Sequence, residues 1–439
     1  MNRRKIFMVF LLAAVLLSGC SALTVEQMYC LPKRSEAYND LQKAIDSAMS
    51  GLDYSAPIAG ENQQTVQMAD LNGDGVQEYL LFARGTAEKP LRILIFGYID
   101  GSYQHIESIE CNGSAFDLVE YVQMDDNDGV EIVVGRQLSD QILRSVSVYT
   151  FANGEAEQLL SVNYTEFLTL DMDADGYTEL FVLRSGLPDS GRGIAELYGV
   201  EDGVIERSNE VDMSVSVDKL KRVIIGKLHG GQTAVYAASA LGDTAIITDV
   251  YALTDGKLTN VTFSSESGTS IQTIRNYYVY ADDIDDDGVI ELPYLINMVM
   301  LEDADSTDKH DLIRWYAMTV DGKEVDKMYT FHNFVGGWYI RLDSRWASRL
   351  SVQNFGNRYE FYLWDSTFEN AQKILTIYAL TGHNRDEQGA AQDRFILYRT
   401  ESVVFAAQLE NAAADYGIRK ETLIDSFCLI QQDWKTGET

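Results

Sequence analysis

Side-chain oxygens recur at every second position in an acidic segment early in the chain. Asp70, Asn72 and Asp74 occupy its first, third and fifth positions, and Glu78 occupies the ninth. Gly75 at the sixth position permits the sharp backbone turn that gathers these oxygens around one point. Calcium takes about six to eight hard oxygen ligands, and the carbonyl of the seventh residue would add another. The segment is therefore predicted to be a calcium-binding loop.

The acidic loop recurs, and an alternating, strand-like pattern follows each copy. The loop glycines are Gly75, Gly129, Gly176 and Gly288, and a further copy at Gly231 keeps the glycine and the strand but has lost the acids. Further along each unit, an aromatic strand ends in an Asp-Gly or Asn-Gly turn, at Gly101, Gly154, Gly203, Gly256 and Gly322. Such dipeptides between alternating strands indicate β-hairpins. Each unit has room for four short strands, which is the size of a propeller blade.

This repeat resembles a known family. The pattern Asp-x-Asn/Asp-x-Asp-Gly-x-x-Glu between two strands, repeated at blade spacing, is similar to the FG-GAP or VCBS repeats of integrin-alpha-like β-propellers. The resemblance implies a ring of four-stranded blades with a calcium ion in the loop between two strands of a blade. We therefore expect a mainly β chain, with a β-propeller of about five blades, or six or seven, over residues 55–330. An α+β module is expected over residues 331–439.

The resemblance also implies a set of calcium ligands, with the metal in a structural role. They are Asp70, Asn72, Asp74, Val76 and Glu78 in the first loop, Asp171, Asp173, Asp175, Tyr177 and Glu179 in the third, and Asp283, Asp285, Asp287, Val289 and Glu291 in the fifth. The second loop departs from the pattern, because its acid comes one residue early and a methionine stands first. Asp126, Asp128 and Glu131 are therefore weaker candidates. EF-hands and dockerins share the loop but require a helix after it, and here the following residues alternate.

The pattern of the N-terminal residues predicts an export signal. Arg3, Arg4 and Lys5 precede an apolar run too short to span a bilayer, and the run ends in Leu-Ser-Gly-Cys at Cys20. This ending resembles the bacterial lipobox, which implies a lipoprotein signal peptide at 1–19 and lipidation of Cys20. A tether at 20–34 and a packing helix at 35–52 are expected to follow. The chain is therefore expected to be exported and lipid-anchored on the extracytoplasmic face of the bacterial cell membrane.

Charge and cysteine content narrow the classes of partner. A formal net charge of −32 disfavours nucleic acid and anionic lipid, so membrane attachment is expected through the lipid alone. If Cys20 carries the lipid, three cysteines remain, at positions 30, 111 and 428. Their wide spacing fits neither a disulfide framework nor a zinc site. The sequence leaves undecided whether Cys30 and Cys111 form a disulfide bond.

The C-terminal module lacks acidic loops. Its strands are predicted at 336–342, 359–364, 373–380 and 394–399, the first of which could close a sixth blade. A helix over 402–416 and a second helix with Leu423, Phe427, Ile430 and Trp434 on one face are expected to follow.

Two functional hypotheses stay open. The five histidines show no metal-ligand spacing, and neither a Gly-x-Ser-x-Gly motif nor a phosphate-binding glycine loop occurs in the sequence. We therefore favour a non-catalytic, calcium-stabilised cell-envelope lipoprotein whose propeller binds a protein or glycan partner. The alternative is an exported polysaccharide-active hydrolase or lyase that uses the propeller as a scaffold.

Overall fold

The computed structural model describes residues 36–138, 143–151, 154–201, 204–276, 279–299 and 310–430. The predicted signal peptide (1–19), Cys20 and the tether (20–34) lie outside these residues. The predicted N-terminal helix is present as α3 (Glu36–Ala48). Among the described helices, none has the length and apolar character needed to cross a bilayer.

The strands form six antiparallel sheets that succeed one another along the chain. The first sheet contains β1 (Asp53–Tyr54), β2 (Val66–Ala69), β3 (Glu78–Arg84), β4 (Leu91–Ile99) and β5 (Ser102–Cys111). The second contains β6 (Ala115–Val122), β7 (Glu131–Gln137), β8 (Arg144–Thr150) and β9 (Glu157–Tyr164). The third contains β10 (Glu166–Leu170), β11 (Glu179–Ser185), β12 (Gly193–Glu201) and β13 (Val204–Asp212). The fourth contains β14 (Leu220–Lys227), β15 (Thr233–Leu241), β16 (Ala245–Thr254) and β17 (Lys257–Asn260).

The last two sheets include the C-terminal strands. The fifth contains β18 (Glu291–Asn297), β19 (Asp311–Met318), β20 (Glu324–Asn333), β21 (Trp338–Leu342) and β27 (Phe427–Leu429). The sixth contains β22 (Leu350–Asn354), β23 (Arg358–Leu363), β24 (Gln372–Thr381), β25 (Phe395–Arg399) and β26 (Val403–Leu409). Two short helices accompany them, α4 (Arg385–Gly389) and α5 (Lys420–Ser426). Short 3-10 turns lie at Val217–Lys219, Ile271–Thr273, Ser344–Trp346, Phe368–Asn370 and Asn411–Ala414.

The predicted fold class is confirmed, because the chain is mainly β and its sheets are of the propeller-blade type. Within each of the first four sheets four strands pair as consecutive hairpins, from the strand before the loop to the strand after the hairpin turn, and in the first sheet β1 also pairs with β3. Asp100 and Gly101 have φ angles of 49° and 87°, and Asp255 and Gly256 have 51° and 73°. Two successive positive φ angles are what a type I′ hairpin turn requires.

The core lies between neighbouring sheets. Alternation along β3 sends Leu80 and Phe82 to one face, where they pack against residues of the second sheet such as Phe116. The rings of Phe82 and Phe116 meet edge to face, with centroids 5.1 Å apart. Similar clusters join the second sheet to the third and so on to the sixth. Burying each large apolar side chain contributes about 1.5–3 kcal/mol, so stacking the sheets stabilises the whole array.

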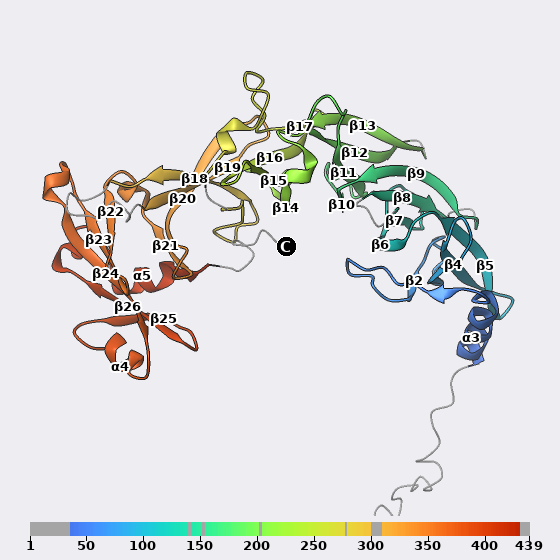
Figure 1. The fold of residues 1–439 in the computed structure, drawn as a ribbon, viewed down its shortest axis with the longest axis horizontal. Helices are drawn as coiled ribbons and strands as arrows, with labels where there is room; N and C mark the ends of the chain where they lie inside the picture. The colour runs from blue at the N-terminus through green and yellow to red at the C-terminus, as the bar shows by residue number, and fades with distance from the viewer. Residues whose placement is uncertain are drawn as a thin grey trace, which may run out of the picture.

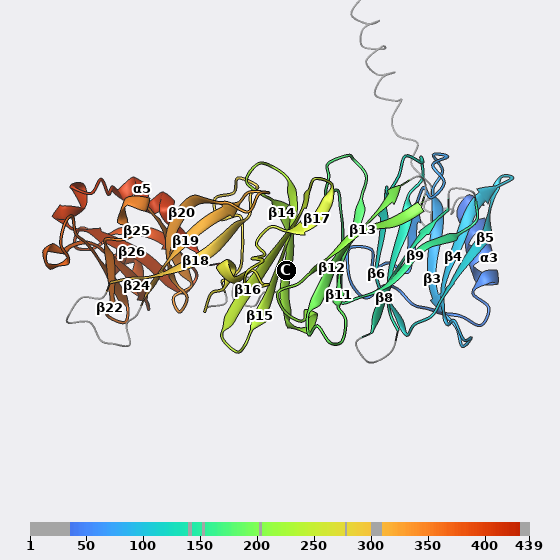
Figure 2. The same cartoon turned by 90° about the horizontal axis from the view of Figure 1, so that it is seen from above.

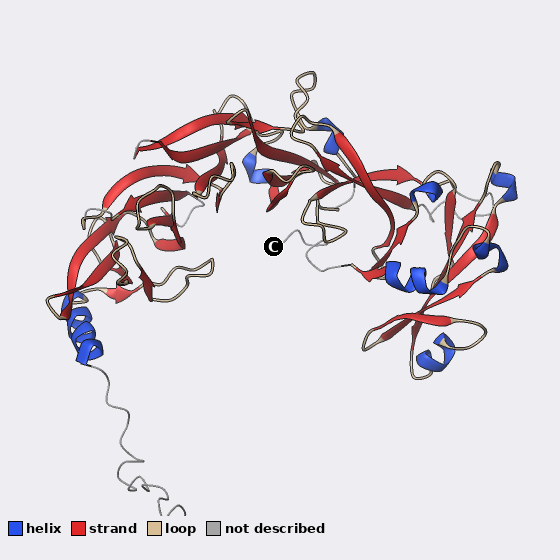
Figure 3. Cartoon of the chain, turned by 180° about the vertical axis from the view of Figure 1, so that it is seen from behind, coloured by secondary structure: helices blue, strands red, loops and turns tan. Residues whose placement is uncertain are grey.

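The blades follow an open arc, with the first and sixth sheets at opposite ends (Figure 1). Viewed from above, the sheets succeed one another along a single row (Figure 2). Helices lie at both ends of this row (Figure 3). Leu41 and Ile45 of α3 pack on Leu81 and Phe96, which form the face of the first sheet turned away from the second. Because α3 already covers the face that a last blade would take, the ring implied by the resemblance is not closed.

The C-terminal expectations need correction. The predicted boundary at 330/331 falls inside β20, and the first C-terminal strand, β21, extends the fifth sheet instead of starting a sixth. The expected helix over 402–416 is wrong, because β26 is a central strand paired with β24 on one side and β25 on the other. The second helix ends early, at α5, since Phe427 continues as β27 opposite Ile340. The other predicted strands are present.

A first prediction concerns the cap that α3 forms on the first sheet. Leu41 is 7% exposed, so Leu41→Ala should remove buried contacts and cost about 2–3 kcal/mol of local stability. Hydrogen exchange followed by mass spectrometry should show faster exchange in β3 and β4 than in the sixth sheet. Lys43→Ala on the same helix, at a side chain 76% exposed, is the control and should leave exchange unchanged. Equal exchange in both variants would contradict a stabilising cap.

Candidate metal centre

The acidic loops share one buried hydrogen bond. In four blades a glutamate begins the strand after the loop, and its Oε2 accepts the backbone N–H of the residue seven positions earlier. The N–H of Leu71 donates to Glu78 at 2.9 Å, that of Met124 to Glu131 at 3.0 Å, that of Met172 to Glu179 at 2.8 Å and that of Ile284 to Glu291 at 3.2 Å. All four glutamates are at most 9% exposed. Each is therefore held with its carboxylate toward the inside of the loop.

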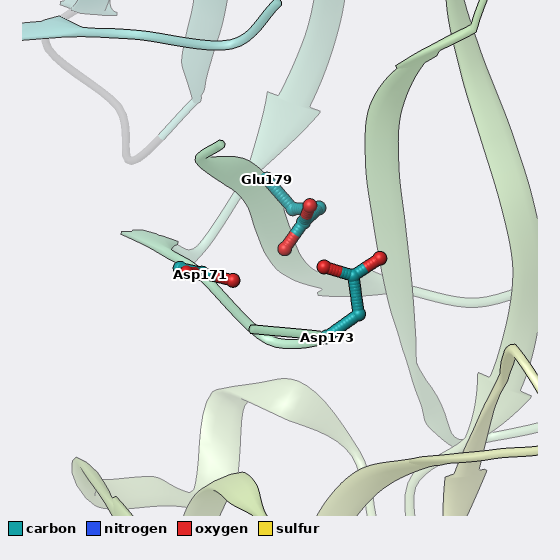
Figure 4. Close-up of side chains that lie close together, drawn as sticks. All are labelled: Asp171, Asp173 and Glu179. Carbon is teal, nitrogen blue, oxygen red and sulfur yellow. The ribbon is translucent and has the colours of Figure 1, made fainter. Parts of the chain in front are cut away.

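The third loop brings its predicted ligands together. Asp171, Asp173 and Glu179 each place a carboxylate oxygen so that all three lie within 4.8 Å of one another. Figure 4 shows the three carboxylates pointing toward a common centre. Backbone N–H groups hold them: Gly176 donates to Asp171 Oδ2 at 3.1 Å, and Asp175 donates to Asp173 Oδ1 at 3.1 Å. Three of the predicted side-chain ligands of this loop therefore form one cluster.

The first and fifth loops use the same framework. Gly75 donates to Asp70 Oδ2 at 2.9 Å, and Gly288 donates to Asp283 Oδ2 at 2.7 Å. Asp283, Asp285 and Glu291 form a second group whose carboxylate oxygens lie within 4.8 Å of one another. All three loops have positive φ at their fourth and sixth positions, at Gly73 and Gly75, Ala174 and Gly176, and Asp286 and Gly288. The left-handed turns explain the sixth-position glycine, while the fourth position tolerates other residues.

The electrostatics of these clusters favour a bound cation. Burial, assisted by the charges of Asp173, Asp175 and Asp171, raises the pKa of Glu179 to about 7, although the Met172 N–H opposes the shift. Burial likewise raises the pKa of Glu291 to about 7. Three inward-facing oxygens, Asp70 Oδ1, Asp285 Oδ1 and Glu291 Oε1, are buried without a hydrogen-bond partner. Hard, anionic oxygens in this arrangement fit calcium, which would relieve both the repulsion and the unmet bonding.

The second loop has a different register from the one the sequence suggested. The bond from Met124 to Glu131 places Met124 at the second position, so Asp125 and Asn127 take the third and fifth. Asn127 N–H donates to Asp125 Oδ1 at 2.8 Å, as the fifth residue does to the third in the first and third loops. Asp126 and Asp128 therefore occupy the fourth and sixth positions, which do not carry ligands in the neighbouring loops. Gly129 lies at the seventh position of this loop and not the sixth, so aligning the loops by their glycines gave the wrong register.

Side-chain nitrogen donors form hydrogen bonds within the second and fourth loops. Gln123 stands at the first position of the second loop, and its side-chain amide donates to the carbonyls of Asp125, at 2.9 Å, and Asn127. In the fourth loop Thr233 replaces the glutamate, and Lys227 Nζ donates to Thr233 Oγ1 at 2.8 Å. The fourth loop therefore has a hydroxyl where the other loops have a carboxylate.

The loops of adjacent blades touch one another. A Cβ on Gly73 of the first loop would lie 2.4 Å from Asp128, so the two loop backbones are in direct contact. Thr178 N–H in the third loop donates to the carbonyl of Gln123 in the second at 2.8 Å. Lys227 at the fourth loop forms a parallel bridge with Val289 of the fifth. The shape of one loop is therefore transmitted to the next blade.

A cleft of about 850 Å³ opens over the third loop. Asp173 and Glu179 line it together with Arg207 of the same blade, Asp125 of the second and Lys257 of the fourth. The Arg207 guanidinium pairs with Glu196 and Glu210, at 2.6 and 2.9 Å. Its charge is therefore engaged within its own sheet and not with the carboxylates of the third loop. The cleft is a mixed-charge groove above an acidic cluster.

The cysteines and two further polar residues complete the comparison with the sequence. Cys111 is a buried free thiol whose Sγ lies 3.4 Å from the hydroxyl of Tyr149, and Cys428 is also free. Cys20 and Cys30 lie outside the described residues.

Sequence reasoning missed two polar groups, Gln123 and Lys327, whose side chains enter the loops. Gln123 could have been found by aligning the glutamates instead of the glycines, whereas Lys327 lies on a distant strand and has no local signal.

Comparisons with known proteins give likeness in fold only. No protein-family model matches the chain, and no curated protein matches it. Similar solved structures include a rhamnogalacturonan lyase from Bacillus licheniformis, 13% identical, with a TM-score of 0.30 over 68% of this chain and 66% of that one. The β-propeller domain of the Trilobed protease from Pyrococcus furiosus is 12% identical, with a TM-score of 0.27 over 72% and 89%. The Dos1 propeller is 10% identical, with a TM-score of 0.28 over 81% of each chain.

The third loop yields a prediction about backbone strain. Ala174 has a φ of 64°, a left-handed conformation that glycine adopts at the matching position, Gly73, of the first loop. Ala174→Gly should therefore stabilise the metal-free protein by about 1 kcal/mol, measured as a higher midpoint of urea denaturation. Ala390→Gly is the control, since Ala390 has a φ of −104° and should gain nothing. A lower midpoint for Ala174→Gly would refute the assigned strain.

Proposed function

We propose that this protein is a non-catalytic, calcium-stabilised lipoprotein of the cell envelope whose blades bind a protein or glycan partner. The repeats are inferred to be of the FG-GAP or VCBS type, with calcium in the first, third and fifth loops. Lipidation of Cys20 would hold the chain on the extracytoplasmic face of the membrane, since two acyl chains anchor stably. Neither nucleic acid nor an anionic lipid surface suits a chain of net charge −32.

The observation that carries the calcium role is the contact between loops of successive blades. A loop that holds several carboxylates resists closing unless a cation offsets their repulsion. The first loop packs on the second at Gly73, and the third bonds to the second through Thr178. Calcium in the first and third loops would therefore stiffen the junctions between blades as well as the blades themselves. This is a structural role for the metal.

The cleft over the third loop is the proposed partner-binding surface. It joins three blades, so a partner seated there would contact residues that only the assembled arc brings together. Tyr177 offers an aromatic ring, and Lys257 offers a cationic group beside the acidic loop. A ligand rich in hydroxyl groups, such as a neutral glycan, would match this lining.

Chelation tests the calcium role directly. Calcium at ten times its dissociation constant stabilises a folded protein by about 1.4 kcal/mol per site. Adding EGTA should therefore lower the melting temperature in calorimetry, and restoring calcium should recover it. Equal melting temperatures in EGTA and in calcium would refute the metal assignment.

A pair of variants locates the effect in the third loop. Asp171→Ala removes one carboxylate of the cluster and should lose part of the calcium-dependent rise in melting temperature. Gln232→Ala is the matched control, because Gln232 lies in the fourth loop, where the acids are missing, and is exposed. If both variants keep the full calcium-dependent rise, the third loop is not a calcium site.

An exported hydrolase or lyase remains the second candidate, because Glu179 has a pKa near neutrality and lines a cleft. However, Glu291, at the same position of the fifth loop, has an equally raised pKa. A shift that recurs with the repeat indicates a structural cause, which favours the binding role. We therefore expect the protein to bind an immobilised glycan or protein array and to release no shorter products from soluble polysaccharides. Release of unsaturated or reducing-end products would support the enzyme instead.

A further inference from the structure

Lys327 enters the fifth loop from another part of its blade. Along β19 and β20, Trp315 pairs with Met328 and Tyr316 pairs with Asp326, so Lys327 is the extra residue of a β-bulge. A bulged residue has no partner in the ladder and can aim its side chain out of the regular alternation. The Lys327 side chain is only 17% exposed, although lysine side chains are rarely buried without a partner.

The ammonium group lies among the carboxylates of the fifth loop. Lys327 Nζ donates a hydrogen bond to Asp287 Oδ2 and lies 3.7 Å from Glu291 Oε1. Glu291 is fully buried, and its Oε1 has no hydrogen-bond partner. Asp287 and Glu291 are the fifth and ninth residues of the loop, the positions at which a calcium ion would take ligands. The lysine therefore offers its charge to the same oxygens that the metal would use.

The third blade provides a natural comparison. Its bulge lies at the same place, because Leu197 pairs with Asn209 and Tyr198 pairs with Arg207, which leaves Ser208 as the extra residue. Ser208 lines the cleft over the third loop together with Glu179. The two blades thus share the bulge and the acidic cluster, but a hydroxyl stands in the third blade where an ammonium group stands in the fifth.

We propose that Lys327 is a tethered cation that competes with calcium in the fifth loop. It compensates Asp287 and Glu291 when no metal is present, and calcium must displace it to bind. The fifth loop therefore binds calcium more weakly than the third and keeps its shape at calcium concentrations that empty the third. This inference rests on the proposed calcium role of the loops and adds a residue that sets the affinity of one of them.

Calorimetric titration of the purified full chain with calcium chloride tests the proposal. Lys327→Met keeps the apolar stem but removes the charge, and it should strengthen calcium binding at one site by about tenfold or more. Adding Asp283→Ala to Lys327→Met should abolish that gain, which assigns it to the fifth loop. Lys323→Met is the charge-matched control, since Lys323 is 77% exposed and pairs with Asp321. It should leave every calcium affinity unchanged.

A reciprocal change and a second readout complete the test. Ser208→Lys should weaken calcium binding at the third loop, because it places an ammonium group beside Glu179. In EGTA, Lys327→Met should melt at a lower temperature than Lys323→Met, since it leaves Asp287 and Glu291 without their cation. In saturating calcium the two melting temperatures should converge.

The outcomes separate this inference from the calcium role itself. If the unaltered chain binds calcium and Lys327→Met has the same affinities as Lys323→Met, the tethered cation is refuted while the calcium role stands. If no variant binds calcium, the calcium role and the competition both fail. Lys327→Met would then still test whether the ammonium stabilises the loop, through its melting temperature in EGTA.

Discussion

The hydrogen bond between a loop N–H and a buried glutamate is the interaction on which the acidic blades depend. Burial fixes the glutamate at the start of a strand, and the loop must then compensate its negative charge or its unmet oxygen. The third loop gathers three carboxylates, whose charge a cation would offset. In the fifth loop the Lys327 ammonium group lies 3.7 Å from the buried glutamate, whereas in the second loop the Gln123 amide binds backbone carbonyls. The fourth replaces the glutamate with Thr233. One constraint is thus met in several ways.

The arc follows from the way each sheet buries both faces. Central strands such as β3, β7 and β15 are buried almost without interruption, so both faces of each sheet must be covered, and a neighbouring sheet supplies most of that cover. The array ends where a helix covers the outer face of a sheet, as α3 covers the first sheet through Leu41 and Ile45. At the other end, Gly389 of α4 packs on Val404 and Ala406 of the sixth sheet. The helices at both ends are consistent with an array that ends without closing on itself.

The acidic loops lie at the blade junctions in this protein, which would link the stability of the blades to any binding at the cleft. The third loop bonds to the second through Thr178 and lines a cleft shared by three blades. A cation that orders this loop would also order the floor of the cleft. A partner at the cleft and calcium in the loop would then favour the same conformation, and each would strengthen the binding of the other.

The sequence by itself determined the blades, because the loop spacing, the two-residue period and the Asp-Gly or Asn-Gly turns are local signals that agree with one another. It also located the oxygen clusters at Asp171 and Asp283. Only the tertiary structure decided the register of the second loop, the entry of Lys327 through a bulge and the end of the array at α3. These depend on contacts between distant segments. The same cause explains β26, which lies in a segment predicted to be helical and is a central strand because β24 and β25 pair with it.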